Sequence, residues 1–585
     1  MIVLKIIVTK MTYERSFNLL NSKFKELFFP TLLAAIAGNF ALIADGLIIS
    51  ALLGPMNLSV IQSIEPLAQF ANVIYWLIGF GGTILSTSAK ANFDEKKANR
   101  IFTLSLVSII IISLLITLFG FLFSDSFLQA LCNSAQIRPL LYEYYKYYLI
   151  AIPIMCFFIV LAYFAKTDNF VQLQFRSFLL ANTLNVVFDI VLIKYFNMGI
   201  GGAALSTVLG YLFATIYLST YLFNSRRTLK LIKIEFSKSI RDLLNICKTG
   251  FSSSSIALYQ SVKLLVVNFL ILAALKDVGL VAYHMCCNVL LVVSIFIFGT
   301  AQSILPIVTV YFQERDYNGV DYVAKKSLKI SIFFGVAFTL LLTIFPQSIL
   351  YLFSLKDPSN VPIVMNAVRI FSLCLLAYSI NFLYIFYLQS IQNNKIVNIV
   401  TLLNGLILPV TFVFIFSLLR NENGIWFAFV LTEIVTLIFI YIYSRYLNKK
   451  TGGEYSGLFL KKQHDKNEKM MEYTIRGDKK EGVCLSKQIL KVLPESNASS
   501  FVSLALEEIT LYILDINDNL DWIDIIVRDN EESVIISIKY SGKGYNPKEI
   551  DNMDSDNVKK LGNLLDDIEY SQILGLNNTV ITINK

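Results

Sequence analysis

The stretch Asn182-Thr-Leu-Asn-Val-Val-Phe-Asp-Ile-Val-Leu-Ile-Lys-Tyr-Phe-Asn-Met-Gly-Ile-Gly-Gly-Ala-Ala-Leu-Ser-Thr-Val208 joins two apolar segments through a glycine-rich turn. Its first segment carries Asn185 and Asp189, which are four residues apart and therefore share one face of a helix. Thr207 follows in the second segment. A charge at the centre of a bilayer costs roughly 3 kcal/mol by insertion scales, so a carboxylate here indicates a function. A carboxylate, an amide and a hydroxyl on adjacent helices would form an oxygen-rich site that suits a proton or a small cation.

The composition is that of a polytopic membrane protein. The 585 residues are 55% hydrophobic and only 16% charged, whereas a soluble domain is about 25% charged. The mean hydropathy is +0.62. The net charge of +8 comes mostly from short loops, so it reports orientation and gives no reason to expect a nucleic-acid partner. The seven cysteines have no metal-binding or disulfide spacing.

Twelve apolar runs are long enough to cross about 30 Å of hydrocarbon. They fall at 27–50, 58–85, 101–124, 141–165, 173–196, 201–224, 250–274, 279–304, 328–353, 364–390, 395–418 and 424–447. Alternate loops are rich in Lys and Arg, and the loops between them are poor in both. The positive-inside rule therefore predicts a multi-pass protein with both termini in the cytoplasm, and we expect it in the plasma membrane.

The chain also repeats itself. Phe93-Asp-Glu-Lys-Lys-Ala-Asn99 follows the second run, and Phe312-Gln-Glu-Arg-Asp-Tyr-Asn318 follows the eighth, 219 residues later. At the same spacing Asn404 corresponds to Asn185, and Leu408 stands where Asp189 would be. Both halves enter the membrane from the same side, so the repeat is parallel. The single Asp189 predicts that ion coupling lies in the first half.

The expected fold is all-α, with twelve transmembrane helices in two pseudo-symmetric six-helix bundles and a small α+β domain after them. We divide the chain into an N-terminal cytoplasmic segment (1–26), a first lobe (27–224) and a connector with a surface helix (225–249). A second lobe (250–447), a linker (448–470) and a C-terminal cytoplasmic domain (471–585) follow. In the last domain alternation and helical periodicity predict strands at 472–476, 522–528, 533–540, 568–573 and 578–584, and helices at 481–493, 497–515 and 556–567.

Asp45 is a second carboxylate inside an apolar run. It is either a protonatable group facing the bundle interior or a structural hydrogen-bond partner of a neighbouring helix, and we favour the first reading. Lys263 and Glu433 are candidates for a charged pair in the second lobe. Here we favour a buried structural ion pair or a snorkelling lysine over a second functional site.

Residues 25–447 resemble the MATE (multidrug and toxic-compound extrusion) transporters. The likeness rests on Asp45 in the first run, on Ile78-Gly-Phe-Gly-Gly82, and on N-x-x-x-D at Asn185 and Asp189 followed by M-G-I-G-G-A-A-L-S-T. The resemblance implies an antiporter that is not an enzyme and exports organic cations and drugs by alternating access in exchange for H⁺ or Na⁺. It assigns the cation to Asp45, Asn185, Asp189 and Thr207. An acidic residue that some members carry in the seventh span is replaced here by Lys263.

Small cationic or amphipathic substrates would then pass between the lobes. Aromatic rings can bind cations by their faces, although ordinary helix packing is the simpler reading for each ring. The candidates are Tyr75, Trp76, Tyr378 and Tyr384.

Residues 471–585 resemble the GHKL ATPase fold, in its anti-sigma-factor kinase branch, at 504–509, 538–547, 568–570 and 578–581. Four residues after Glu508 the family has a Mg²⁺-binding Asn, and this chain has Tyr512. The adenine-binding D-x-G is replaced by Tyr540-Ser541-Gly542. Without these ligands we expect no ATP cofactor and no ATPase or kinase activity. The domain is interpreted as a regulatory module that binds a cytoplasmic protein partner.

Two other functions stay open at this point. A flippase for a lipid-linked or polysaccharide precursor would share the two-bundle plan, and Lys263 suits an anionic headgroup. A membrane sensor could signal through its ATPase-like tail, but the degenerate nucleotide motifs argue against it.

Overall fold

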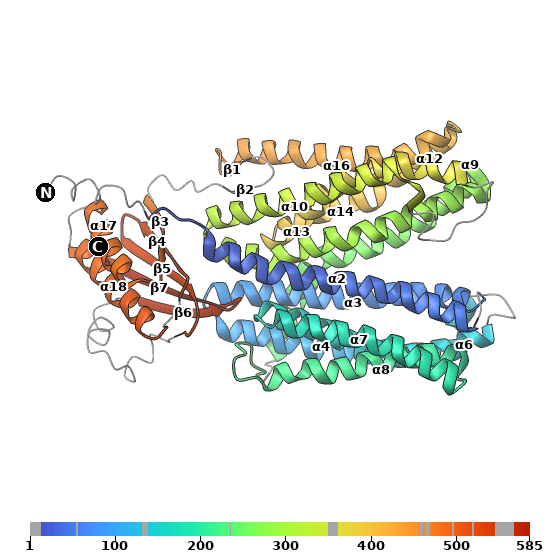
Figure 1. Cartoon of the computed structure of the whole chain (residues 1–585), viewed down its shortest axis with the longest axis horizontal. Coiled ribbons are helices and arrows are strands. Elements are labelled where there is room, and N and C mark those ends of the chain that lie inside the picture. Colours follow the sequence, from blue (N-terminus) through green and yellow to red (C-terminus); the bar gives the residue numbers. More distant parts are fainter. Residues whose placement is uncertain are drawn as a thin grey trace.

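The computed structural model describes residues 13–53, 56–131, 138–233, 236–348, 361–456, 460–461, 469–493, 497–517, 520–544 and 567–585. A long bundle of helices forms one part of the molecule, and a β-sheet domain caps one end of it (Figure 1). The bundle helices are α2 (Asn18–Leu53), α3 (Met56–Ala91), α4 (Glu95–Leu122), α5 (Ser124–Leu131), α6 (Arg138–Thr167), α7 (Val171–Asp189), α8 (Gly199–Ser219), α9 (Phe236–Gln313), α10 (Tyr317–Ile344), α12 (Val361–Ser372), α13 (Leu375–Ser390), α14 (Asn394–Leu402), α15 (Leu408–Leu418) and α16 (Glu422–Lys450).

Ten helices of the described chain are long and apolar enough to cross a membrane, or eleven when the bent pair α12 and α13 counts as one span. The expected first span, 27–50, lies within α2, which is not among these ten, so a total of twelve spans stays a prediction. The long helix α9 is broken at Lys276, where φ is 59° and ψ is −156°. It therefore provides two spans, Ile240–Lys276 and Val278–Gln313, as predicted for 250–274 and 279–304.

The expected connector 225–249 differs from the structure. Helix α9 begins at Phe236, well before residue 250, because the apolar residues Leu243 and Ile246 continue the helical period of the span that follows. The surface helix predicted in this connector is thus the first part of α9 itself.

The two lobes approach each other closely where α3 crosses α9. A Cβ on Gly250 would lie 1.8 Å from the Leu77 carbonyl oxygen, and one on Gly81 would lie 2.1 Å from the Ile246 carbonyl oxygen. Only glycine allows the two backbones to come this close. Gly81 belongs to the motif 78–82 noted in the sequence.

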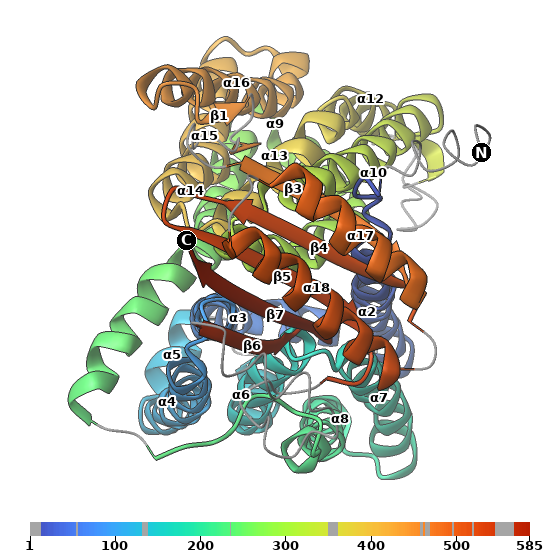
Figure 2. The ribbon, with the colours of Figure 1, turned by 90° about the vertical axis from the view of Figure 1, so that its left-hand side faces the viewer.

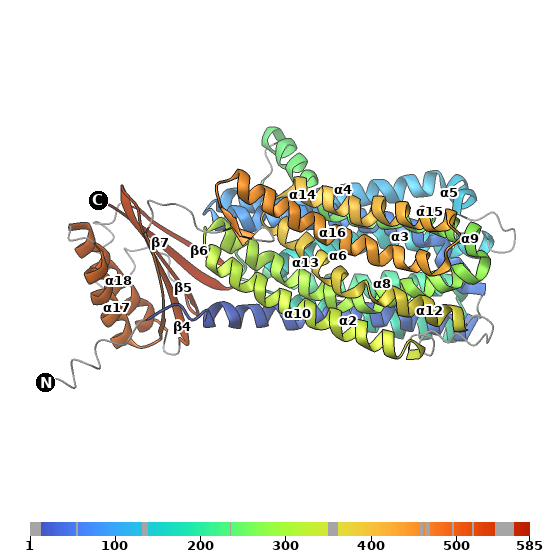
Figure 3. The ribbon, with the colours of Figure 1, turned by 90° about the horizontal axis from the view of Figure 1, so that it is seen from above.

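The C-terminal domain is one antiparallel sheet with two helices. Strands β3 (Lys469–Arg476), β4 (Trp522–Asp529), β5 (Ser533–Ser541), β6 (Asp567–Ile573) and β7 (Leu576–Asn584) pair in the order β3-β4-β5-β7-β6. Helices α17 (Lys479–Val492) and α18 (Asn497–Asp515) cover the face of the sheet that is turned away from the bundle (Figures 2 and 3). The predicted elements of this domain are confirmed within a few residues, except that 556–566 of the expected last helix lie outside the described residues. The short pair β1 (Tyr455–Ser456) and β2 (Leu460–Lys461) forms a two-stranded sheet within the expected linker.

Alternation along β4 decides which residues meet the bundle. Ile523, Ile525 and Val527 are buried in the core of the domain under its helices. Asp524 and Arg528, on the opposite face of the strand, contact residues at the end of the bundle.

Candidate functional site

Three helices of the first lobe bring the predicted cation-site residues together. Asp45 comes from α2, Asn185 and Asp189 from α7, and Thr207 from α8. The Asn185 amide donates to the Thr207 hydroxyl oxygen at 3.0 Å. The Asp189 carboxylate is fully buried and accepts from the hydroxyl of Ser206, which precedes Thr207.

The carboxyl groups of Asp45 and Asp189 lie close enough together to interact electrostatically. Asp45 Oδ1 and Asp189 Oδ2 are buried, and no hydrogen-bond partner reaches them among the described residues. Two carboxylates in contact away from water repel each other unless a proton or a cation lies between them. The pair is therefore suited to hold one positive charge.

The available ligands suit a hard cation. In the described part of the chain, no group of three or more His, Cys, Asp or Glu side chains is arranged to hold a metal ion. Around Asp45 and Asp189 the ligands would be carboxylate, amide and hydroxyl oxygens, which favour a proton or Na⁺ over a transition metal.

Local helix geometry positions this cluster. A Cβ on Gly210 would lie 2.8 Å from the Ala181 carbonyl oxygen and 3.2 Å from the Asn185 nitrogen, so glycine lets α8 pack against the backbone of α7. Directly after Asp189 the helix widens into a π-helical segment, Ile190–Tyr195. Such segments recur at functional sites, and Asp189 lies where the winding of the helix changes.

The second lobe holds a different polar cluster. The buried Glu433 carboxylate accepts from the amides of Asn381 and Asn404, at 2.8 and 2.9 Å. Asn404 also lies 3.3 Å from the Thr436 hydroxyl oxygen. Among the described ion pairs none joins Lys263 to Glu433, and Lys263 contributes only a lesser electrostatic attraction to this carboxylate. Amides, and not a lysine, are the direct partners of Glu433.

The loops show how the two lobes correspond. Each lobe has non-glycine residues with positive φ at equivalent loop positions, which are Phe93 and Arg315, Asn169 and Gln392, and Asn197 and Arg420. The members of each pair are 222 or 223 residues apart. That spacing carries Asn185 to Leu408 and Asp45 to Asn268. The predicted equivalence of Asn404 with Asn185 is therefore wrong by one helical turn, because the short match of 93–99 with 312–318 is itself three residues out of register and one more residue is added before Asn169.

Sequence reasoning missed Ser206 and Asn381. Ser206 lies beside the predicted Thr207 and caps the Asp189 carboxylate, and its place one residue from a predicted site residue is the signal that could have identified it. Asn381 lies on α13 in the run Ser-Ile-Asn-Phe-Leu, where a single amide among apolar residues gives a weaker signal.

The predicted aromatic residues are buried or packed against neighbouring rings, and one of these contacts joins the two lobes. Trp76 of α3 stacks on Phe298 of α9, with ring centroids 6.3 Å apart, and Tyr378 lies 5.6 Å from Phe382 on α13. Tyr75 and Tyr384 are buried. These contacts support the packing interpretation, and they leave cation binding by the rings as a prediction.

The lobes also touch near the end that carries the C-terminal domain. The Lys166 ammonium, at the end of α6, donates to the Gln302 carbonyl oxygen of α9 at 3.2 Å. Phe80 of α3 packs edge-on against Phe386 of α13, with centroids 6.0 Å apart. Side chains of both lobes therefore meet at this end of the bundle.

The C-terminal domain is tied to the second lobe by buried charges. Lys539 of β5 pairs with Glu314 at 2.5 Å, just after α9, and Asn578 of β7 donates to the other oxygen of Glu314 at 2.8 Å. Arg528 donates to the Glu314 carbonyl oxygen at 2.6 Å. Burial raises the pKa of Glu314, and Lys539 offsets only part of that effect.

The same domain holds the N-terminal segment. Thr474 of β3 donates its backbone N–H to the Tyr13 carbonyl oxygen at 3.3 Å, and its hydroxyl accepts from the Ser16 N–H at 3.1 Å. Between them, the buried Arg15 reaches Glu472 of β3 and Asp524 of β4, at 3.5 and 3.7 Å. Residues that enter the first lobe through α2 are thereby fixed to the sheet.

A hairpin completes the junction. The turn between β6 and β7 reaches the bundle, where Ile573 and Leu574 join its hydrophobic core. A Cβ on Gly575 would lie 2.1 Å from the Asn169 side chain, in the loop between α6 and α7 of the first lobe. One domain thus contacts both lobes (Figure 2).

The four residues that the sequence suggested for a degenerate nucleotide pocket lie in two parts of the C-terminal domain. Glu508 and Tyr512 lie half-buried on α18, and Tyr540 is fully buried in the core between sheet and helices. Gly542 follows β5 with a φ of 135°.

Comparisons with known proteins identify relatives of the helical part of the chain. The Multidrug export protein MepA of Staphylococcus haemolyticus (strain JCSC1435) is 24% identical over 373 residues, which are 63% of this chain and 81% of that protein. MepA of Staphylococcus aureus (strain bovine RF122 / ET3-1) is 23% identical over 354 residues, 60% of this chain and 77% of its own.

Solved structures share the fold. An outward-facing multidrug resistance MATE family transporter of the MOP superfamily superposes with a TM-score of 0.69 at 20% identity, covering 74% of this chain and 96% of that one. A MOP superfamily transporter from Pyrococcus furiosus, described as having a binding pocket of reverse polarity, gives the same score, identity and coverage. The MatE family model matches residues 30–191 and 253–415, together more than half of the chain. The chain belongs to the MatE family.

Proposed function

We propose that this chain is a secondary active exporter of organic cations and other amphipathic drugs, driven by an inward gradient of H⁺ or Na⁺. The observation that carries the proposal is the pair of buried carboxyl groups, Asp45 and Asp189, which lie close together inside the first lobe with unpartnered oxygens. MepA, named as a multidrug export protein, supports the substrate class.

The coupling ion would bind between the two carboxyl groups, with Asn185, Ser206 and Thr207 as further oxygen ligands or donors. Its arrival removes the repulsion within the pair and allows α2 and α7 to pack more closely. Transport needs only that the ion and the drug prefer different arrangements of the lobes. The second lobe has Phe412 and Asn268 at the positions 223 residues after Asp189 and Asp45, and the absence of a carboxylate there supports placing this step in the first lobe.

The basic loops support a plasma-membrane orientation in which the C-terminal domain and the N-terminal segment are cytoplasmic. Because that domain contacts both lobes at one end, it would hold the cytoplasmic end closed and act as a regulator of opening. The altered motifs at Tyr512 and Tyr540 support a GHKL-like module without ATPase activity that responds to a protein partner.

Purified protein in proteoliposomes tests the proposal. A cationic dye should be transported only when a proton or a sodium gradient is imposed, and the two gradients applied separately identify the ion. Dye transport that is equal without either gradient would refute coupled export. Scrambling of a fluorescent lipid-linked precursor without dye transport would favour the flippase instead.

A further inference from the structure

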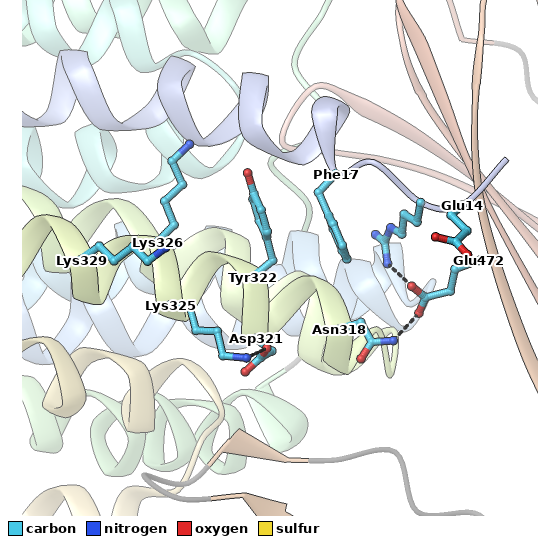
Figure 4. Close-up of a pocket in the computed structure, with 10 residues that line it drawn as sticks. Glu14, Phe17, Asn318, Asp321, Tyr322, Lys325, Lys326, Lys329 and Glu472 are labelled. Carbon is cyan, nitrogen blue, oxygen red and sulfur yellow. Dashed lines mark hydrogen bonds and ion pairs between the residues drawn. The ribbon is translucent and has the colours of Figure 1, made fainter. Parts of the chain in front are cut away.

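A cavity of about 790 Å³ opens where the N-terminal segment, α10 and β3 meet (Figure 4). Its wall on α10 includes Asp321 and three lysines, Lys325, Lys326 and Lys329, and its other wall includes Glu14, Arg15 and Glu472. A second, apolar groove of about 280 Å³ lies against α10 and is lined by Phe28, Lys329, Ile330, Phe333 and Phe334. Lys329 lines both spaces, so the polar cavity and the apolar groove lie next to each other on α10.

Some of the basic side chains that line the cavity have a carboxylate partner, and others have none. Arg15 is paired with Asp316, and Lys325 is paired with Asp321 at 2.5 Å. Within the described residues, no carboxylate pairs with Lys326 or Lys329. Two ammonium groups on one face of α10 are therefore left without a counter-charge.

The surroundings of Lys326 add to this excess. Its ammonium donates to the Asn21 side chain and lies 4.8 Å from the centre of the Phe24 ring. Neither neighbour carries a negative charge, and Lys25 is close enough to repel it. An anion bound beside Lys326 would relieve this repulsion.

The apolar groove has the position of a lipid chain. Phe333 is 67% exposed on the outer surface of the bundle. It lies seven residues after Lys326, which is about 10 Å further along the helix axis. A molecule that spans both spaces must carry an anionic head and a long apolar tail, one after the other.

We propose that this cavity and groove bind one anionic phospholipid from the leaflet on the side of the C-terminal domain. Its phosphate lies at Lys326 and Lys329, and one acyl chain runs along Phe333 and Phe334. Arg15 and Glu472 line the same cavity, so the headgroup lies beside the contacts that hold the C-terminal domain. The site does not depend on the drug or on the coupling ion.

Intact-protein mass spectrometry on the full chain tests the site, with dioctanoyl phosphatidylglycerol as the probe. We expect one bound lipid per chain, and at least a tenfold loss of affinity for the double variant Lys326→Gln, Lys329→Gln, since each lysine near a lipid surface contributes attraction. The double variant Lys96→Gln, Lys97→Gln is the matched control. It removes the same charge from two exposed lysines at the start of α4, and its affinity should equal that of the wild type.

Two further arms keep the test decisive. The single variant Lys329→Gln alters an exposed side chain, so it should fold and still bind the probe several-fold more weakly. Glycerol 3-phosphate and dioctanoyl phosphatidylcholine should not compete with the probe. Equal binding of glycerol 3-phosphate would replace the lipid with a soluble phosphate ligand, and equal binding of phosphatidylcholine, or an equal loss in the control variant, would overturn the proposal.

Discussion

The Arg15 guanidinium donates two parallel hydrogen bonds to the Asp316 carboxylate, at 2.8 and 2.7 Å, and both side chains are almost fully buried. Arg15 lies three residues before the start of α2 in the first lobe, and Asp316 immediately precedes α10 of the second. Glu472 and Asp524 of the C-terminal domain complete the surroundings of the guanidinium. A single buried charge therefore joins three parts of the chain.

Loss of the Asp316 charge should release the C-terminal domain. Asp316→Asn keeps the side-chain oxygen that caps α10 through the Gly319 N–H, at 2.9 Å, but it leaves Arg15 buried without its main partner. Breaking a buried pair in this way costs about 3–5 kcal/mol. Energy transfer between labels on Cys484 and on a cysteine replacing Lys96 should fall, in a background without other cysteines.

The control is Asp94→Asn. Asp94 caps α4 through the Lys97 N–H at the same distance of 2.9 Å, but it is exposed and has no ion pair among those described. This variant should keep the energy transfer of the wild type. An equal fall in both variants would mean that helix capping, and not the ion pair, holds the junction.

Docking of the domain should strengthen as the pH falls from about 8 to about 5. Burial raises the pKa of Glu314, Glu472 and Asp524, with Lys539 or Arg15 opposing only in part. A carboxyl with a raised pKa binds more protons in the docked state, so protonation favours docking as the pH approaches that pKa.

Asp316 responds in the opposite sense, but only in stronger acid. Burial alone would raise its pKa, yet the Arg15 guanidinium outweighs burial and holds the pKa well below the usual range. Its stabilising effect is present above the ordinary value of about 4 and is lost as the pH falls through the lowered pKa. The same energy-transfer measurement, made between pH 8 and pH 5, checks this pH dependence. Stronger docking of the C-terminal domain at pH 8 than at pH 5 would contradict it.

The crossing of α3 and α9 should not tolerate a methyl group. Gly250→Ala would place a Cβ 1.8 Å from the Leu77 carbonyl oxygen, and such overpacking costs typically 1–3 kcal/mol. The midpoint of thermal unfolding in detergent should fall clearly. Gly405→Ala, whose Cβ would lie 3.1 Å from Tyr259 Cβ, should cost much less, and equal midpoints for the two variants would speak against a close crossing.

The full chain should not bind Mg-ATP at millimolar concentration. Tyr512 cannot supply the metal ligand that an asparagine would, and the Tyr540 side chain is enclosed in the domain core. Equilibrium binding of a fluorescent ATP analogue, with and without Mg²⁺, is the measurement. Saturable Mg²⁺-dependent binding of the analogue would contradict this prediction and show that the domain binds nucleotide.

The sequence predicted local structure well where one physical pattern dominates. The strands of the C-terminal domain alternate between apolar and polar residues, so β4 and β5 were located within one residue of their ends. The break at Lys276 could be predicted because a charged residue interrupts two apolar runs. In the candidate site, Asn185, Asp189 and Thr207 were identified because polar groups in apolar helices are costly.

Contacts between distant segments could not be predicted in this way. In the sequence, Arg15 is one of several charged residues near the N-terminus. Its buried partner, Asp316, lies 301 residues later and is identified only in the folded chain. The match of Asn404 to Asn185 failed because the 219-residue spacing came from a short loop match that is three residues out of register. Lys263 and Glu433 are both charged residues in apolar runs, but the direct partners of Glu433 are the amides of Asn381 and Asn404.

Gradient-driven transport by two charge-removing variants tests the central claim most directly. In proteoliposomes with the gradient that drives the wild type, Asp189→Asn should abolish the dependence of dye transport on that gradient, because it removes one carboxylate of the Asp45–Asp189 pair. Glu433→Gln removes a buried carboxylate from the second lobe and should keep that dependence. Full gradient dependence in Asp189→Asn, or its loss only in Glu433→Gln, would contradict coupling through the first lobe.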